Sequence, residues 1–150
     1  MNLLPVVLDA AGLSAMALPG RQGADRSLFG ILDAAWSIGR EVMVPAVVCA
    51  EVCRGIARTR QVEALLARHK PGRKQQSPVS IVETDFALAR LVGTVLEASK
   101  AGSKDMVDAH VVAVCVKRGG GMVVTSDPGD LHRLSSPFIG ARIIVRTLKR

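Results

Sequence analysis

An apolar helix followed closely by an apolar strand constrains this chain more than any other feature. Apolar residues cover nearly every side of the helix expected over residues 107–116, so this helix should be buried rather than lie on the surface. Gly119 can adopt the left-handed conformation that ends a helix, and residues 122–125 have the composition of a strand. A buried helix joined to a short buried strand predicts a fold in which helices pack against a sheet.

Short apolar strands alternate with helical patterns along the rest of the chain. Thr84 is a plausible N-cap for one of the helices, and flanking arginines suit an edge position for the last strand. This alternation predicts an α/β fold, namely a three-layer α/β/α domain with a mainly parallel five-stranded sheet. The expected strands are residues 4–8, 42–45, 79–82, 122–125 and 142–146, and the expected helices are 25–38, 46–53, 56–69, 85–100 and 107–116, with a short helix or turn at 10–17.

Length, composition and charge limit the possible classes of protein. The chain has 150 residues, which fits a single domain over residues 1–150 with one core. Hydrophobic residues make up 49% of the chain, too many for a disordered protein. The net charge of +7 favours an anionic partner, most often nucleic acid. Aromatic residues make up only 3% of the chain, so base-stacking surfaces of the kind that single-strand binders use are not expected.

The cysteines and the hydropathy of the chain indicate its compartment. There are three cysteines, Cys49, Cys53 and Cys115, and an odd count at this low density predicts a reducing environment. No second Cys or His pair completes a zinc pattern, so the cysteines are interpreted as small buried apolar residues. No apolar run approaches the length of a membrane span, and the N-terminal segment lacks the basic region of a signal peptide. We therefore expect a cytoplasmic protein.

Four acids are expected to meet at one edge of the predicted sheet. Asp9 ends the first strand and Asp127 ends the fourth, whereas Glu51 and Asp108 lie in early turns of helices. Helices of right-handed crossovers run antiparallel to the strands, so these helices begin at the carboxyl edge of the sheet, where open α/β folds bind ligands. Clustered carboxylates have raised pKa values unless a cation lies among them. Mg²⁺ and Mn²⁺ prefer such oxygen ligands.

Each of these acids also has an interpretation without a ligand. Asp9 could be a turn residue, and Asp127 could be a turn or cap residue beside the Pro-Gly pair that follows it. Asp130 is interpreted as a helix cap in preference to a ligand, and Asp105 as an acid that stabilises a helix N-terminus. Glu51 is harder to explain in this way, because its helix is otherwise apolar and a buried Glu is rare.

Three segments of the chain resemble the motifs of PIN-domain ribonucleases, in particular the VapC-type toxins of type II toxin–antitoxin systems. They read VVLDAAGLSA, VPAVVCAEVCRG and VDAHVVAVCVKRGGGMVVTSDPGDL. In that family the acids matching Asp9, Glu51, Asp108 and Asp127 form the metal site and carry catalysis. The chain departs from the family at Ala11, where a small hydroxyl residue often stands, and this bears on local hydrogen bonding rather than on the set of acids.

The resemblance implies an endoribonuclease that depends on Mg²⁺ or Mn²⁺ and cleaves RNA phosphodiesters with a metal-activated water. It also implies a cognate antitoxin protein and a homodimer. Two alternatives stay open at this point. One is a non-catalytic PIN-like module that binds RNA or a partner protein. The other is a receiver-like signalling domain that binds Mg²⁺, although such a domain has an acid pair after the first strand, where this chain has Asp9 followed by Ala10 and Ala11.

Overall fold

Five parallel strands form the central sheet. The computed structural model describes residues 3–17, 24–66 and 79–148. The strands are β1 (Val6–Leu8), β2 (Val42–Pro45), β3 (Ser80–Val82), β4 (Gly120–Thr125) and β5 (Arg142–Thr147). They lie in the order β3-β2-β1-β4-β5, and every neighbouring pair is parallel. The predicted sheet is thus confirmed, and it is parallel throughout, with β5 at an edge as its flanking arginines indicate.

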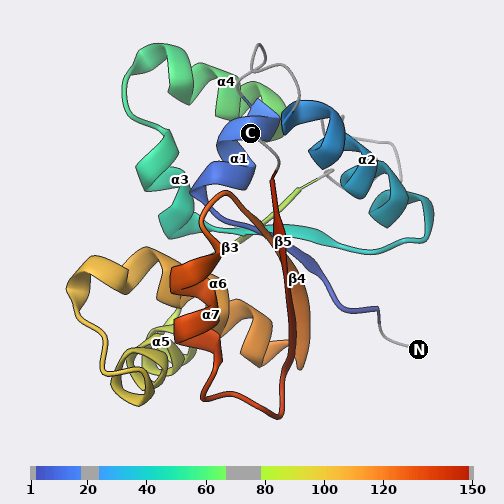
Figure 1. Ribbon diagram of the computed structural model, residues 1–150. Helices are drawn as coiled ribbons and strands as arrows, with labels where there is room; N and C mark the ends of the chain where they lie inside the picture. The colour runs from blue at the N-terminus through green and yellow to red at the C-terminus, as the bar shows by residue number, and fades with distance from the viewer. Residues whose placement is uncertain (1–2, 18–23, 67–78, 149–150) are drawn as a thin grey trace.

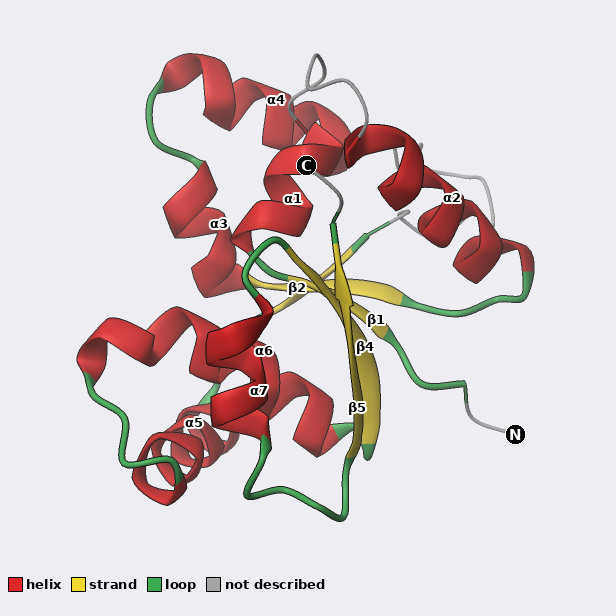
Figure 2. Ribbon diagram, in the orientation of Figure 1, coloured by secondary structure: helices red, strands yellow, loops and turns green. Residues whose placement is uncertain are grey.

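Helices cover both faces of the sheet, as Figures 1 and 2 show. One layer holds α1 (Ala10–Ala17), α2 (Ala24–Ser37), α3 (Ala46–Val52) and α4 (Ile56–Leu66), and the other holds α5 (Phe86–Ala98), α6 (Met106–Lys117) and α7 (Pro128–Ser135). The predicted α/β/α layering is therefore confirmed. None of the helices within the described ranges is long and apolar enough to cross a membrane.

The buried helix that the sequence predicts is α6. Its residues 109–115 are all buried, and it packs against β1, β2 and β4. Gly119 follows the helix with a φ of +79°, which confirms the predicted left-handed end. Gly120 then begins β4, and a Cβ atom at this position would lie 2.3 Å from the carbonyl oxygen of Arg142 on β5. The short turn therefore fixes the end of α6 at the amino edge of the sheet and the start of α6 at the carboxyl edge.

One predicted helix start is wrong, and one predicted helix end lies outside the described residues. The predicted N-cap Thr84 is wrong, because Asp85 caps α5 and accepts a hydrogen bond from the Leu88 backbone N–H at 2.8 Å. A carboxylate three residues before that N–H reaches it without distortion of the first turn. The predicted end of the fourth helix, residues 67–69, lies outside the described residues, within which α4 runs from Ile56 to Leu66.

Candidate metal centre

Asp9 lies at the carboxyl end of β1, immediately before α1, and its side chain is only 7% exposed. Its Oδ1 accepts a hydrogen bond from the Gly12 backbone N–H at 2.9 Å. Burial raises the pKa of Asp9, while hydrogen bonds from the Thr125 side chain and from the Gly12 and Ala11 backbone lower it, and Glu51 raises it further. Ala11 has no hydroxyl group, so only its backbone acts on Asp9, and the hydroxyl group that acts on Asp9 belongs to Thr125 on β4.

Asp108 lies in the first turn of α6, where it is partly buried. Burial, together with the charges of four nearby carboxylates, raises the pKa of Asp108 to about 6. In order of their effect, these are Asp9, Asp130, Glu51 and Asp105. The structure therefore brings Asp9, Glu51 and Asp108 within electrostatic reach of one another, as the topology predicts. It also adds two acids from the same stretch that the sequence interpretation assigned to helix ends.

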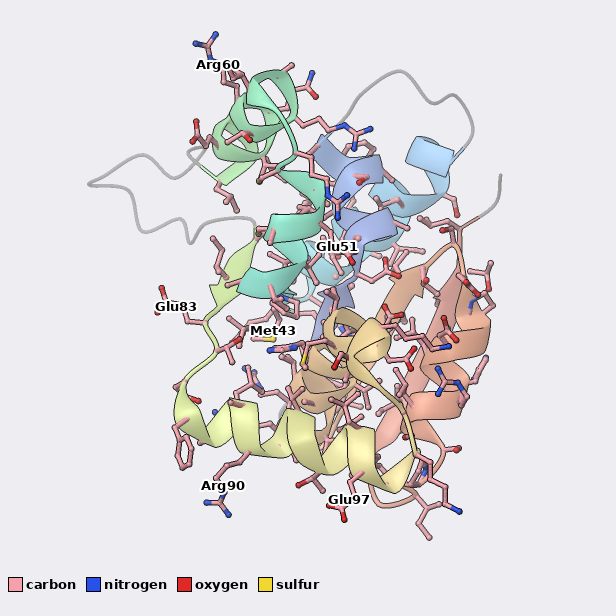
Figure 3. All side chains as sticks on the ribbon, turned by 90° about the vertical axis from the view of Figure 1, so that its left-hand side faces the viewer. Met43, Glu51, Arg60, Glu83, Arg90 and Glu97 are labelled. Carbon is pink, nitrogen blue, oxygen red and sulfur yellow. The ribbon has the colours of Figure 1, made fainter. Side chains whose placement is uncertain are left out.

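Glu51 lies in the last turn of α3, and its side chain is exposed. The expectation that this glutamate is buried is therefore wrong. Helix α3 is short, and Val48 and Val52 are the residues that it buries, so a polar side chain between them can reach solvent. Figure 3 shows Glu51 where α3 and α1 pass close to each other. The Glu51 carboxylate still raises the pKa of both Asp9 and Asp108.

Asp127 lies where the sequence places it, after β4 and at the start of a helix, whereas Asp130 does not have its expected position. Asp127 is the N-cap residue of α7, with an exposed side chain that makes no capping hydrogen bond, and its backbone N–H donates to Thr125 Oγ1 at 3.0 Å. The interpretation of Asp130 as the cap is wrong, because α7 begins at Pro128 and Asp130 lies in its first turn. Among the carboxylates, only Asp9 affects the pKa of Asp108 more than Asp130 does.

Arg133, which the sequence analysis did not single out, connects two of these acids. Its Nη2 lies 2.9 Å from Asp105 Oδ1 and 3.2 Å from Asp130 Oδ1. Asp105 is 4% exposed. Its Oδ2 is buried and has no hydrogen-bond partner among the described residues. The three-residue spacing of Asp130 and Arg133 on one helix is a recognisable ion-pair signal, whereas the contact with Asp105 depends on tertiary packing.

The acids suit a hard divalent cation by type and burial. Carboxylate oxygens are the ligands that Mg²⁺ and Mn²⁺ prefer, and clustered acids with raised pKa values gain stability from a cation. Across residues 3–17, 24–66 and 79–148, however, no three side chains of His, Cys, Asp or Glu are already arranged to hold a metal ion. A cation at this edge would therefore require the carboxylates to turn toward a common point.

The nearby histidine and the cysteines have structural environments. His110 is buried in α6, and its Nδ1 lies 2.7 Å from the Met106 carbonyl oxygen of the preceding turn. Cys115 is a free thiol, and burial raises its pKa to about 12. Cys49 and Cys53 are also free and are partly buried. These side chains pack within the fold, in agreement with the interpretation of the cysteines as small apolar residues.

Comparison with known proteins places this geometry in a family. Residues 6–136 match the PIN domain family. The structure is similar to a chain of VapBC2 from Rickettsia felis bound to a DNA fragment from their promoter, with a TM-score of 0.62, 12% identity, and coverage of 97% of this chain and 100% of that one. It is also similar to a chain of DNA-bound VapBC from Salmonella typhimurium, with a TM-score of 0.55, 16% identity, and coverage of 95% and 98%.

Both solved structures are less than a fifth identical to this chain, so their likeness concerns the fold. No curated protein sequence matches the chain. The family match, in contrast, covers most of the sequence and includes the strands and helices that carry Asp9, Glu51, Asp108 and Asp127. The chain belongs to the PIN domain family.

Proposed function

We propose that this PIN domain is an endoribonuclease that depends on Mg²⁺ or Mn²⁺. The observation that supports the proposal most is the placement of Asp9 and Asp108, which come from distant parts of the sequence and meet at the carboxyl edge of the sheet. Burial raises the pKa of both side chains, and the Asp9 carboxylate raises the pKa of Asp108 further. Acids held together in this way favour a divalent cation.

The proposed ligands are Asp9, Glu51, Asp108 and Asp127, which are also the proposed catalytic residues. A bound divalent cation would supply positive charge that stabilises the phosphodiester as it is cleaved by water. The chain prepares the site in two ways. The backbone N–H of Gly12 fixes the orientation of Asp9, and Asp108, with a pKa of about 6, is ionised and ready to bind at neutral pH.

Exposed arginines offer a surface for the RNA backbone. Arg54 follows α3 and lies three residues beyond Glu51, and Arg58 and Arg60 are exposed on α4. Figure 3 shows Arg60 at the outer end of this layer, beyond Glu51 as seen from the sheet. Guanidinium groups bind phosphates through charge and paired hydrogen bonds. We place the RNA along this surface, with the scissile phosphate at the carboxylates.

We further propose that the protein is the toxin of a toxin–antitoxin pair. This is supported by the VapC-like motifs of the sequence and by the shared fold with chains of two VapBC complexes. In this proposal a cognate antitoxin protein inhibits the nuclease, and the toxin acts in the cytoplasm as a homodimer of single-domain chains. A small neighbouring reading frame that encodes a DNA-binding protein would support the assignment.

A non-catalytic module that binds RNA or a partner protein is the second candidate. It is favoured by the finding that the described side chains do not already converge as a metal site. Titration of the purified protein with Mn²⁺ separates the two candidates, because a site without catalytic function should bind the ion poorly. The receiver-like alternative is wrong, because the chain belongs to the PIN domain family.

RNA cleavage by the purified protein tests the proposal. We expect Mn²⁺-dependent cleavage by the wild type, a loss of at least about 100-fold in Asp9→Asn, and wild-type activity in Glu97→Gln. Glu97 is an exposed acid on α5, well away from Glu51 in Figure 3. Cleavage that persists in Asp9→Asn would contradict the assignment of Asp9.

A further inference from the structure

The contacts of Arg133 connect the starts of two helices. Its guanidinium binds Asp105, immediately before α6, and Asp130, in the first turn of α7. The two contacts differ in their surroundings, because the Asp105 side chain is 5% exposed and the Asp130 side chain is 49% exposed. The buried contact anchors the arginine, and the anchored arginine then restrains the more exposed acid.

The restrained acid is held beside the start of α6. Arg133 joins Asp130 to Asp105, three residues before Asp108, and α7 packs against α6, whose first turn carries Asp108. Asp130 lies in the first turn of α7, after the N-cap residue Asp127, where an acid also interacts favourably with the helix dipole. Its hydrogen-bonding partner within the described chain is Arg133, three residues further along α7.

We propose that Arg133 is a positioning residue of the carboxylate site: by binding Asp105 and Asp130 together, it holds the Asp130 carboxylate beside Asp108, where Asp130 contributes to binding the divalent cation. This inference rests on the proposed function, because it assumes that the cluster binds a cation. It assigns to Arg133 an indirect role through Asp130, and it adds Asp130 to the acids that matter for the ion.

The sign of the change in metal affinity tests this role. If Arg133 only placed positive charge near the site, its removal would strengthen Mn²⁺ binding, because the repulsion of the ion would be relieved. If Arg133 positions Asp130, its removal weakens Mn²⁺ binding, as loss of a residue that orients a metal ligand commonly does by about 10–100-fold. The two roles therefore predict opposite shifts of the dissociation constant.

The experiment is a calorimetric titration of the full-length variants with Mn²⁺ alone. We expect Asp130→Asn and Arg133→Gln each to weaken Mn²⁺ binding by at least about tenfold. Arg133→Lys should weaken it less, because lysine keeps the positive charge but lacks the planar set of guanidinium N–H donors. The matched control is Arg118→Gln, which removes a half-exposed guanidinium that pairs with Glu41 at 3.4 Å and should leave Mn²⁺ affinity unchanged.

A double-mutant cycle distinguishes a positioning role from general loss of structure. If Arg133 acts through Asp130, Arg133→Gln should have little further effect on Mn²⁺ affinity when Asp130→Asn is already present. An equal effect in both backgrounds would overturn the proposal, and so would unchanged or tighter binding by Arg133→Gln alone.

A second variant covers the case in which Arg133→Gln does not fold, since it leaves the buried Asp105 without its partner. The variant Asp105→Asn/Arg133→Gln removes the buried charge together with its partner, and the same tenfold loss of Mn²⁺ affinity is expected from it. Asp9→Asn distinguishes failure of the proposed function from failure of the role of Arg133. If Asp9→Asn binds Mn²⁺ normally, the proposed function fails; if it loses binding while Arg133→Gln and Asp130→Asn do not, only the role of Arg133 fails.

Discussion

Among the carboxylates of the described residues, Asp9 raises the pKa of Asp108 most, although Asp9 follows β1 and Asp108 lies on α6. The pairing results from the parallel sheet. β1 ends at the carboxyl edge of the sheet. Because α6 ends beside the start of β4, at the opposite edge, it begins at the carboxyl edge too. The two acids are thus brought together by the topology of the fold, and their environment has consequences for stability and for binding.

The raised pKa of Asp108 makes the stability of the metal-free protein depend on pH. The folded-state pKa of about 6 lies above the ordinary aspartate value of 3.8, so the contribution of Asp108 to stability is full below pH 4 and is lost as pH rises through 6. Because Asp108 is partly exposed, we expect Asp108→Asn to raise the free energy of unfolding at pH 7 by only about 1 kcal/mol, or roughly 2–4 °C in Tm. Thermal unfolding in EDTA at pH 4 and pH 7 checks this, and a variant less stable than the wild type at pH 7 would contradict it.

Metal affinity should depend on pH in the opposite direction. A carboxylate binds a divalent cation when it is ionised, and Asp108 becomes protonated as pH falls below about 6. We expect the apparent Kd for Mn²⁺ to rise by up to about tenfold for each unit of pH below that value, because protons compete with the ion. Titrations at pH 5 and pH 7 measure the change. Equal affinity at the two values would show that Asp108 is not a ligand.

Two glycines should respond to alanine with opposite changes in stability. Gly120 has a φ of +146°, and a Cβ atom there would lie 2.3 Å from the Arg142 backbone oxygen, so Gly120→Ala should destabilise the protein by at least about 3 kcal/mol. Gly93 lies within α5, where an added Cβ would meet nothing within 4 Å. Gly93→Ala should stabilise the protein by about 0.5–1 kcal/mol. Urea denaturation gives both values, and equal effects would be inconsistent with the close approach of β4 and β5.

The proposed RNA surface predicts a specific loss of salt dependence. Replacing Arg54 removes one phosphate contact, so Arg54→Gln should weaken RNA binding and reduce the slope of log K against log salt by about 1. Binding is measured in EDTA, which prevents cleavage. The control is Arg90→Gln, an exposed arginine on α5 that lies far from Glu51 in Figure 3. The same slope in the wild type and in Arg54→Gln would place the RNA elsewhere.

The sequence predicts the sheet well because the central strands β1, β2 and β4 contain short apolar runs, which are typical of a buried parallel sheet. Element order alone then places Asp9 and Asp108 at one edge. It does not predict the exposure of Glu51, because burial of a single side chain depends on which sides of α3 are covered. It also does not predict the contact of Arg133 with Asp105, since that contact depends on how α7 packs beside α6.

The clearest difference between the sequence prediction and the structure concerns Asp130, which the sequence assigns to a helix cap. The family motif indicates Asp127, because this residue follows β4. In the structure, Asp130 is second only to Asp9 among the carboxylates that raise the pKa of Asp108. A strand-end motif locates the start of the following helix only to within a few residues. A few residues cover every direction around a helix, so the packing of the helix decides which acid faces the site.

The most direct test of the account is a crystal structure of the protein with Mn²⁺, in which anomalous scattering locates the ion. We predict a peak at the carboxyl edge of the sheet, with carboxylate oxygens of Asp9 and Asp108 about 2.0–2.3 Å away. The same peak should be absent in Asp9→Asn under identical conditions. The absence of a peak at saturating Mn²⁺, or a peak that contacts neither Asp9 nor Asp108, would contradict the claim that these two acids hold the cation.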